Sequence, residues 1–217
     1  MNAPDPRYFT PNGSGAFTSN GAFRLLHHGQ VLRRYNFEVA LEAVEQARAD
    51  IPGLELDLYG DGEEGYIEDL RRFVRAHGLS GCVRFHDRVP VEQVPDLIRQ
   101  ADIGLVPCRR DVFVDKVMLP VRLLEYVVMG LPAVVSRVGT VEAYFGSDEV
   151  AYYPHNDAGA LAHRIVDLYR NPRQRTQMAE RAKNAFRSHE WPQMQKRYYR
   201  VLDALLNGDG PLVGSLV

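Results

Sequence analysis

The sequence predicts an α/β fold in which a doubly wound parallel sheet has helices on both faces and is followed by further helices. Short apolar segments alternate several times with segments whose apolar residues recur at helical spacing. Parallel strands need crossover connections, which are usually helices. The 217 residues, 45% of them hydrophobic, can bury one good core but do not comfortably hold two full domains.

The expected strands begin directly after a segment rich in Pro, Gly, Asn and Ser. In chain order they are 23–29, 54–59, 83–85, 102–106 and 133–136, with 150–153 as the candidate for an edge strand. Helices are expected around 37–44, 66–74, 90–100 and 122–129, the second and last of these stopped by Gly78 and Gly130. From 157 to 206 the pattern is helical, with breaks at Pro172 and at Trp191-Pro192.

Charge and cysteine content exclude several classes of protein. Lys and Arg number 26 against 28 Asp and Glu, and the net charge of −2 gives no broad attraction for nucleic acid or an anionic membrane. Cys82 and Cys108 have neither metal-site spacing nor a neighbouring His cluster, so neither a zinc site nor a disulfide is expected. No apolar run approaches a transmembrane length and no export signal is visible, so we expect a soluble, cytoplasmic protein.

Ligands of open α/β sheets bind at the carboxyl ends of the strands, which singles out four loops. The first, 29–36, carries Arg33 and Arg34 just before a helix, where they either meet a diphosphate or belong to an exposed turn. The second contains Gly60, Asp61 and Gly62, which allow a ligand to approach closely or simply make a tight turn.

The third loop, 86–89, includes Arg88 and Val89, and its main chain offers groups that can read a nucleotide base. The fourth region carries Asp111 and Asp115, passes through Leu119 and Pro120, and enters a helix with Arg122 and Glu125. Three residues separate Arg122 from Glu125, so the two share one helix face. They suit a diphosphate and the ribose hydroxyls, or else form an ordinary surface ion pair worth at most about 0.5 kcal/mol.

Other candidate residues favour structural roles. At least one of His27 and His28 is expected to be a packed core side chain with a backbone partner, and Cys108 a buried, inert thiol. Ser136 and Glu142 either cap the following helix, which is the favoured interpretation, or face a sugar. On the last helix, an apolar stripe predicts core packing; it comprises Met194, Tyr198, Val201 and Leu205.

Several ordered blocks, taken together, resemble a known family. LPVRLLEYVVMGLPAVVS, at 119–136, is similar to a Pro-x-Lys-x-x-Glu-Tyr-x-x-x-Gly-x-Pro-Val-Val stretch, and HHGQVLRRYNFEVALEA, at 27–43, is similar to a His-Gly-Thr-Leu-x-x-Arg-Tyr-Gly variant. In this order they resemble the Rossmann-like C-terminal domain of retaining GT-B glycosyltransferases of the group 1 kind, from about Asn2 to Leu205.

The resemblance implies a function and a division of the chain. Residues 1–22 would be the remnant of an interdomain linker, 23–190 a domain that binds a nucleotide-sugar, 191–207 a C-terminal helix and 208–217 a tail. The donor would be an NDP-sugar of the UDP or GDP type, with no metal or other cofactor. An N-terminal domain, fused or separate, would bind the acceptor, and any peripheral membrane contact would be made through it; this chain alone is expected to be inactive.

Residue by residue, the resemblance assigns ribose binding to Glu125, phosphate binding to Arg122 and Arg34, and a backbone contact with the base to Val89. Val117 stands where the family has the first Glu of its Glu-x7-Glu motif, so that carboxylate is absent. Asp115 or Asp111 is the candidate replacement.

Two other functions stay open. The missing carboxylate motivates one of them, a degenerate domain that senses a nucleotide-sugar or holds a partner protein. The other is a related GT-B epimerase or a flavodoxin-like domain, which is weaker because the Arg-x-x-Glu-Tyr block has no role in a flavodoxin-like domain.

Overall fold

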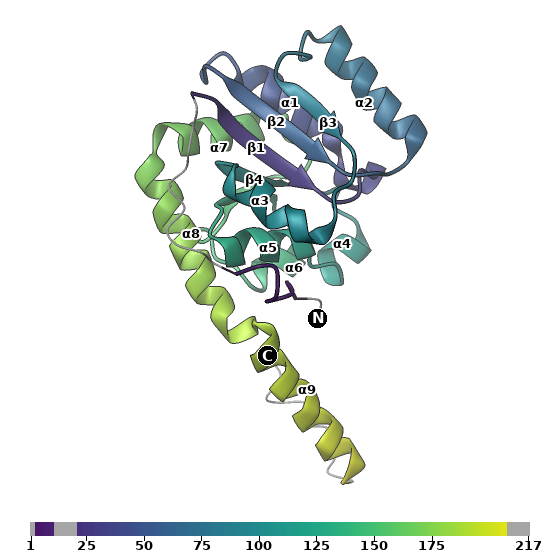
Figure 1. The fold of residues 1–217 in the computed structure, drawn as a ribbon, viewed down its shortest axis with the longest axis vertical. Helices are drawn as coiled ribbons and strands as arrows, with labels where there is room; N and C mark the ends of the chain where they lie inside the picture. The colour runs from purple at the N-terminus through teal and green to yellow at the C-terminus, as the bar shows by residue number, and fades with distance from the viewer. Residues whose placement is uncertain (1–2, 11–20, 208–217) are drawn as a thin grey trace.

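The computed structural model describes residues 3–10 and 21–207 and confirms the predicted fold. Six strands form one parallel sheet in the order β3-β2-β1-β4-β5-β6 (Figure 1). The strands are β1 (Phe23–His28), β2 (Leu54–Tyr59), β3 (Val83–His86), β4 (Ile103–Val106), β5 (Ala133–Ser136) and β6 (Ala151–Tyr153). The edge strand expected at 150–153 is therefore present.

Helices connect each pair of successive strands and continue after the last. They are α1 (Phe37–Ala47), α2 (Glu64–Ala76), α3 (Val94–Arg99), α4 (Val112–Lys116), α5 (Val121–Met129), α6 (Gly139–Glu142), α7 (Ala158–Arg170), α8 (Pro172–Phe186) and α9 (Trp191–Leu206). Pro172 and Pro192 each stand in the first turn of a helix, where proline is tolerated because its missing N–H would have no partner.

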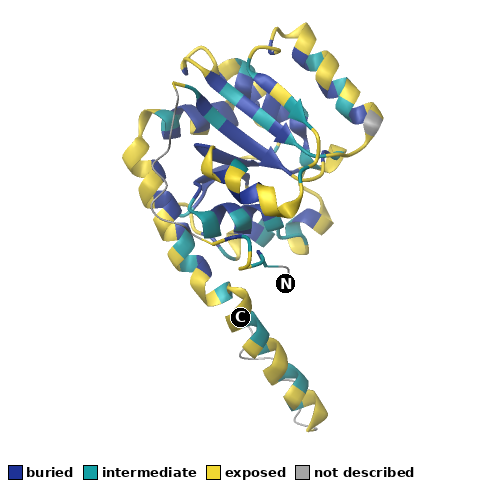
Figure 2. Cartoon of the chain, in the orientation of Figure 1, coloured by how far each residue is buried: buried dark blue, intermediate teal, exposed yellow. Residues whose placement is uncertain are grey.

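Two apolar clusters lie on opposite faces of the sheet. One face packs against α1, α2 and α7, and the other against α3, α5 and α8. Leu25 belongs to the first cluster and Leu26 to the second, as expected for neighbouring residues of a strand. Helices therefore cover both faces, and the central strands are dark blue in Figure 2.

The strand order reverses between β1 and β4, and ligands of such sheets bind at the carboxyl ends of these two strands, a place called the crevice below. The chain runs outward from β1 through β2 to β3 and then returns to β4 on the other side of β1. The connections on the two sides of this point diverge, and the loops after β1 and β4 are left free to hold a ligand.

The region expected to be a loop between β4 and α5 contains a short helix. The Asp111 side chain accepts a hydrogen bond from the Val114 N–H at 2.8 Å and so caps α4. The five residues of α4 are too few to show a helical period of their own, which is why the sequence pattern did not predict it.

The prediction of core packing for the last helix is wrong. None of the residues of α9 is buried, and α9 continues the line of α8 away from the body of the protein (Figures 1 and 2). Tyr198 is 58% exposed and Leu205 is 62% exposed. At the other end of the chain Phe9 is buried in the second cluster, while 1–2 and 11–20 of the expected linker and 208–217, the expected tail, lie outside the described residues.

Candidate functional site

The predicted site residues on α5 lie at the crevice between β1 and β4. α5 begins after Pro120, whose extended backbone (φ −66°, ψ 116°) ends the preceding loop. Arg122 is in the first turn of α5, and Glu125 lies one turn further on the same face. Both side chains reach the residues at the carboxyl end of β1.

Arg122 is a buried cation held by rings rather than by carboxylates. Its residue is only 8% exposed, and its Nη1 lies 2.9 Å from Nδ1 of His27 and also contacts Nε2 of that ring. Its guanidinium carbon lies 4.3 Å from the centre of the Tyr35 ring. Among residues 3–10 and 21–207, no ion pair joins Arg122 to a carboxylate. A buried cation without a compensating anion is costly, so an anionic ligand would be favoured here.

Glu125 faces His28 instead of Arg122. The Glu125 side chain is 14% exposed, and one of its carboxyl oxygens lies 3.3 Å from His28 Nε2. That nitrogen is buried and has no hydrogen bond, because the close approach lacks the required geometry. Burial raises the pKa of Glu125 to about 7 against the opposing effect of Arg122. Burial, and then Arg122, lowers the pKa of His28 to about 3.

These values decide between the two interpretations of the Arg122 and Glu125 pair. An exposed ion pair would leave both groups charged and in mutual contact. The pair described here is largely buried, Glu125 is partly protonated at neutral pH, and His28 is neutral. The arrangement is a buried polar cluster and not a surface ion pair.

The glycines of the second loop are required by close packing of two backbones. A Cβ at Gly60 would lie 1.8 Å from the carbonyl oxygen of Gly29, and its φ of +147° is rarely adopted by other residues. A Cβ at Gly62 would lie 2.1 Å from the carbonyl oxygen of Val31. The Val31 N–H donates to the carbonyl of Asp61 at 2.8 Å. The backbone of loop 60–62 thus packs directly against the backbone of the first loop, which favours the tight-turn interpretation of these glycines.

The two neighbouring arginines of the first loop differ in their partners. Arg33 pairs with Asp69 at 2.9 Å and with Glu63 at 3.6 Å on α2 and the turn before it. Arg34 is exposed, and its guanidinium carbon lies 5.6 Å from the centre of the Phe113 ring on α4. Within the described part of the chain, no carboxylate forms an ion pair with Arg34. Of the two, Arg34 is the arginine with a charge available to a ligand.

The predicted substitute carboxylates already have partners in the protein. Asp115 accepts a hydrogen bond from the Gly139 N–H at 2.8 Å and lies 3.2 Å from Arg110. The bond from Gly139 is the largest cause that lowers the pKa of Asp115. Asp111 caps α4. Val117, at the position where the family resemblance implies a carboxylate, is 67% exposed.

The remaining predicted site residues are partly or fully buried near the crevice, except Arg88, which is exposed. Arg88 is exposed and lies 4.0 Å from Asp61, so the second and third loops meet there. Val89 and Leu119 are partly buried and pack against the second apolar cluster, while Pro120 is buried at the start of α5. The crevice brings Arg34, Arg122 and Glu125 to one edge of the sheet with these loops.

The predicted capping of α6 by Ser136 and Glu142 is wrong. The Ser136 hydroxyl accepts a hydrogen bond from the Cys108 N–H at 2.9 Å and donates one to the Tyr153 hydroxyl at 2.8 Å. It therefore ties the loop after β4 to β5 and β6. Glu142 pairs with Arg137 at 2.6 Å. Burial raises the pKa of the Cys108 thiol to about 11, in agreement with an inert cysteine.

The contacts of the two histidines with the predicted site residues could not be predicted from the sequence pattern. As expected of a packed core side chain, His27 is wholly buried. The available signal was two adjacent ionisable side chains inside an apolar strand, at the end where ligands bind. No cluster of three or more His, Cys, Asp or Glu in residues 3–10 and 21–207 is arranged to hold a metal ion.

None of the helices in the described residues is long and apolar enough to cross a membrane.

Comparison with known proteins extends this picture. The family model of the glycosyl transferases group 1 matches residues 22–171. A GDP-mannose-dependent alpha-(1-6)-phosphatidylinositol monomannoside mannosyltransferase of Mycolicibacterium smegmatis is 26% identical over 151 residues, 69% of this chain and 39% of its own length. The putative colanic acid biosynthesis glycosyltransferase WcaL of Salmonella typhimurium is 27% identical over 143 residues, 65% of this chain and 34% of its own. The chain thus spans less than two fifths of these curated relatives.

Solved structures show the same fold. HepE of Anabaena in complex with UDP and glucose has a TM-score of 0.78 at 17% identity, with 94% of this chain and 56% of that one covered. The C-terminal domain of the glycosyl transferase group 1 family protein LpcC from Francisella tularensis has a TM-score of 0.73 at 13% identity, with 87% and 100% covered. The matched segment contains the whole crevice from β1 to α5, and the chain belongs to the glycosyl transferases group 1 family.

Proposed function

We propose that this chain is the donor-binding half of a retaining glycosyltransferase. It binds an NDP-sugar of the UDP or GDP type in the crevice between β1 and β4, without a metal ion. The observation that carries the proposal is Arg122, a buried guanidinium with no carboxylate paired to it among the described residues. A diphosphate supplies the missing negative charge.

The roles of the site residues follow from their charges and positions. Arg122 and Arg34 offset the charge that develops on the departing diphosphate, which is the main requirement for transfer from an NDP-sugar. Glu125, when ionised, accepts hydrogen bonds from ribose hydroxyls. Asp115 remains a predicted catalytic residue, but its bonds to Gly139 and Arg110 favour a role in positioning α6 and loop 109–111.

The other binding contacts are made by backbone and small side chains. We assign the base to the main chain at Arg88 and Val89, and the turn at Gly60 and Asp61 supports the loop that faces the phosphates. Leu119 and Pro120 fix the start of α5. UDP is bound by HepE, and the Mycolicibacterium relative is GDP-mannose-dependent, so both bases are retained in the proposal.

An acceptor-binding half, fused or separate, completes the proposed enzyme in the cytoplasm. Two exposed apolar surfaces suit contact with it. One is on α4, where Val112 is 81% and Phe113 48% exposed, and the other is on α9, where Tyr198 and Leu205 are exposed. The chain on its own then binds donor but transfers no sugar.

Titration calorimetry of this chain with UDP, GDP and ADP and their sugars tests donor binding. Binding of one diphosphate in the micromolar to millimolar range is expected. If none of them binds at millimolar concentration, the proposal fails.

A second function has one observation in its favour. Val117 presents an exposed apolar side chain where the family resemblance expects an acidic one. A degenerate domain that binds a nucleotide-sugar or a partner without catalysis fits this residue. Coexpression with a GT-B N-terminal half, followed by a donor-hydrolysis assay, separates the two: turnover supports the transferase, and silence with retained binding supports the degenerate domain.

A further inference from the structure

Two consecutive histidines, His27 and His28, end β1 at the edge of the crevice. His27 is 0% exposed and His28 is 7% exposed. Neighbouring residues of a strand point to opposite faces of a sheet. His27 accordingly packs edge-on against Phe37 of α1, with ring centres 4.5 Å apart, and His28 packs edge-on against Tyr126 of α5, with ring centres 5.2 Å apart.

The His27 ring contacts the proposed phosphate-binding residue directly. Arg122 reaches from the first turn of α5 past Gly29 to the ring, where Nη1 lies 2.9 Å from Nδ1 and also contacts Nε2. Since Arg122 can only donate and a neutral ring has one nitrogen without a proton, that nitrogen is the acceptor. Tyr35 covers the guanidinium from a second direction, with its ring centre 4.3 Å away.

A neutral ring holds a guanidinium without cancelling its charge. Burial, then Arg122 and His28, hold the pKa of His27 well below its usual value, so the ring carries no charge at neutral pH. An Asp or Glu in this place would also fix Arg122, but it would compete with a phosphate for the same positive charge. A histidine supplies the orientation and leaves the Coulombic attraction for the ligand.

His28 stands in the same relation to the proposed ribose-binding residue. Its Nε2 lies 3.3 Å from a carboxyl oxygen of Glu125, and this nitrogen has no hydrogen bond although it is buried. A small movement of either side chain would make a bond from the ring N–H to the carboxylate. The ring would then hold one carboxyl oxygen and leave the other for a hydroxyl of the ligand.

The geometry assigns His27 and His28 as positioning residues of the donor site, with His27 orienting the Arg122 guanidinium and His28 orienting the Glu125 carboxyl. This inference rests on the proposed function. It divides the work between the two rings: His27 acts on the part of the ligand that carries phosphate, and His28 on the part that carries the ribose hydroxyls.

Core packing alone predicts a different result, and the division between the rings distinguishes the two. If the rings only fill space between the sheet and Phe37 or Tyr126, replacing either one should weaken every ligand alike through a general loosening. If they position Arg122 and Glu125, each replacement should weaken a different part of the ligand.

The experiment uses the full chain, with UDP and GDP as first probes. Whichever diphosphate binds is then compared with its nucleoside and its 2′,3′-dideoxy diphosphate, by titration calorimetry or ligand-observed NMR. The variants are His27→Leu and His28→Leu, which remove the ring nitrogens, and His27→Gln and His28→Gln, which retain polar groups. His163→Leu on α7, where the ring is 74% exposed and pairs with Asp167, is the control.

His27→Leu is expected to weaken the diphosphate about three- to tenfold, the usual worth of one hydrogen bond, and to leave the nucleoside unchanged. His28→Leu should weaken the nucleoside and the diphosphate by a similar factor and leave the dideoxy diphosphate unchanged. On a logarithmic scale of affinity, each Gln variant should lose at most half of what the matching Leu variant loses. In an Arg122→Gln background, His27→Leu should cause no further loss.

Several outcomes overturn the inference. They are equal weakening of all ligands by either Leu variant, an undiminished effect of His27→Leu in the Arg122→Gln background, or no effect of the Leu variants on any ligand. Should a Leu variant fail to fold, as thermal unfolding would show, the Gln variant and the Arg122→Gln background still decide. If the wild-type chain binds neither UDP nor GDP, the proposed function itself fails, and the inference with it.

Discussion

Replacing Arg122 by Gln should weaken nucleoside diphosphate binding about ten- to a hundredfold. Hydrogen bonds that involve a charged group contribute about 1.5–3 kcal/mol, and about 1.4 kcal/mol corresponds to a factor of ten. Arg122 is 8% exposed, so solvent screens its charge little. The Gln side chain is uncharged, so the variant removes the charge while keeping a polar group at this position.

The same replacement should not destabilise the ligand-free protein. A buried cation without a paired carboxylate costs free energy, and removing the charge relieves that cost. We therefore expect the free energy of unfolding to stay the same or to rise in Arg122→Gln. A structural arginine would behave in the opposite way, since its loss would lower stability and ligand affinity together.

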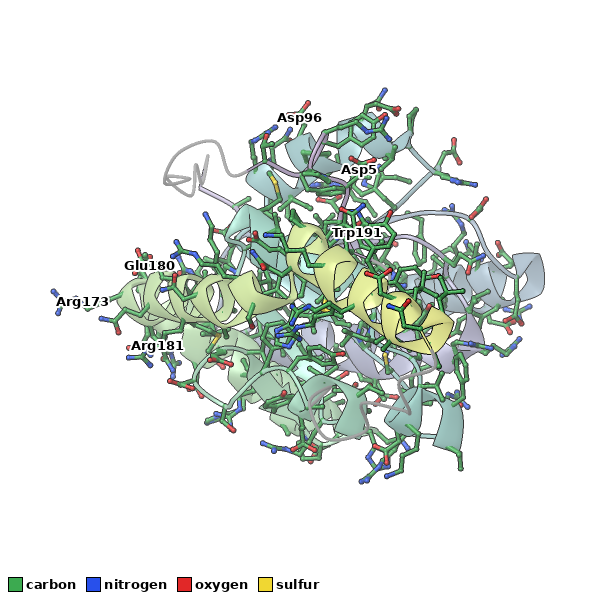
Figure 3. All side chains as sticks on the ribbon, turned by 90° about the horizontal axis from the view of Figure 1, so that it is seen from below. Asp5, Asp96, Arg173, Glu180, Arg181 and Trp191 are labelled. Atoms are coloured by element: carbon green, nitrogen blue, oxygen red, sulfur yellow. The ribbon has the colours of Figure 1, made fainter. Side chains whose placement is uncertain are left out.

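Titration calorimetry with the diphosphate and urea unfolding without it measure the two quantities. Arg181→Gln is the matched control, because Arg181 is an exposed residue of α8 that pairs with Asp148, just before β6 and at the amino edge of the sheet. Figure 3 shows Arg181 at the periphery of the molecule. Unchanged diphosphate affinity in Arg122→Gln, or equal losses in both variants, would refute the assignment of Arg122 to phosphate.

Three further predictions concern charge, protonation and backbone packing. Arg34→Gln should lower diphosphate affinity severalfold. Arg33→Gln, which loses exposed ion pairs with α2 and its preceding turn and a cation–π contact with Tyr66, should not; calorimetry compares the two variants, and equal effects would contradict the distinction. Burial raises the pKa of Glu125 in the folded protein to about 7, against a usual value of 4.5, so folding favours the protonated carboxyl. The resulting contribution to the free energy of unfolding is fully present below pH 4.5 and is lost as the pH rises to 7. At 1.36 kcal/mol per pKa unit, wild type should lose about 3 kcal/mol relative to Glu125→Gln across that range; parallel urea-unfolding curves at every pH would show that Glu125 is not buried as described. Gly60→Ala should lower the free energy of unfolding by at least about 1 kcal/mol because its Cβ would meet the Gly29 carbonyl. Gly65→Ala, in open space on α2, should raise it by about 0.5 kcal/mol. An unchanged free energy of unfolding in urea for Gly60→Ala would contradict the close packing of the two loops.

The alternation of strands and helices could be predicted because it depends on burial alone. β4 and β5 are short buried segments, β1 is mostly buried, and β2 alternates buried apolar residues with half-buried ones. Each of these strands is followed by a segment whose buried residues recur at helical spacing. The edge strand β6 is only three residues long, yet its buried Tyr152 and Tyr153 were a sufficient signal. The positions of the site loops then followed from the rule for parallel sheets.

Features that depend on contacts across the fold could not be predicted in the same way. The Ser136 hydroxyl has the chemistry of a helix cap, but β4 and β6 place Cys108 and Tyr153 closer to it than any helix end. The apolar stripe of α9 has the period of a core helix, and periodicity cannot tell whether the surface that it would cover lies in the same chain. One hydrogen-bond partner of Asp115 is the N–H of Gly139, which is 24 residues away in the sequence, so no local pattern could predict this bond.

The residues that break the rules of core packing in β1 and α5 are neighbours. Two histidines interrupt an apolar strand, an arginine is buried without a carboxylate partner among the described residues, and a glutamate is buried with a raised pKa. Each of these alone would be a cost to folding, and the four side chains form two contacting pairs at the carboxyl end of β1. A natural protein tolerates such a concentration of costs where a ligand relieves them, since an anion compensates the cation and hydroxyl groups donate to the carboxylate. Under the proposed function the two pairs serve different parts of one ligand: Arg122, held by His27, would meet the phosphates, and Glu125, beside His28, would meet the ribose.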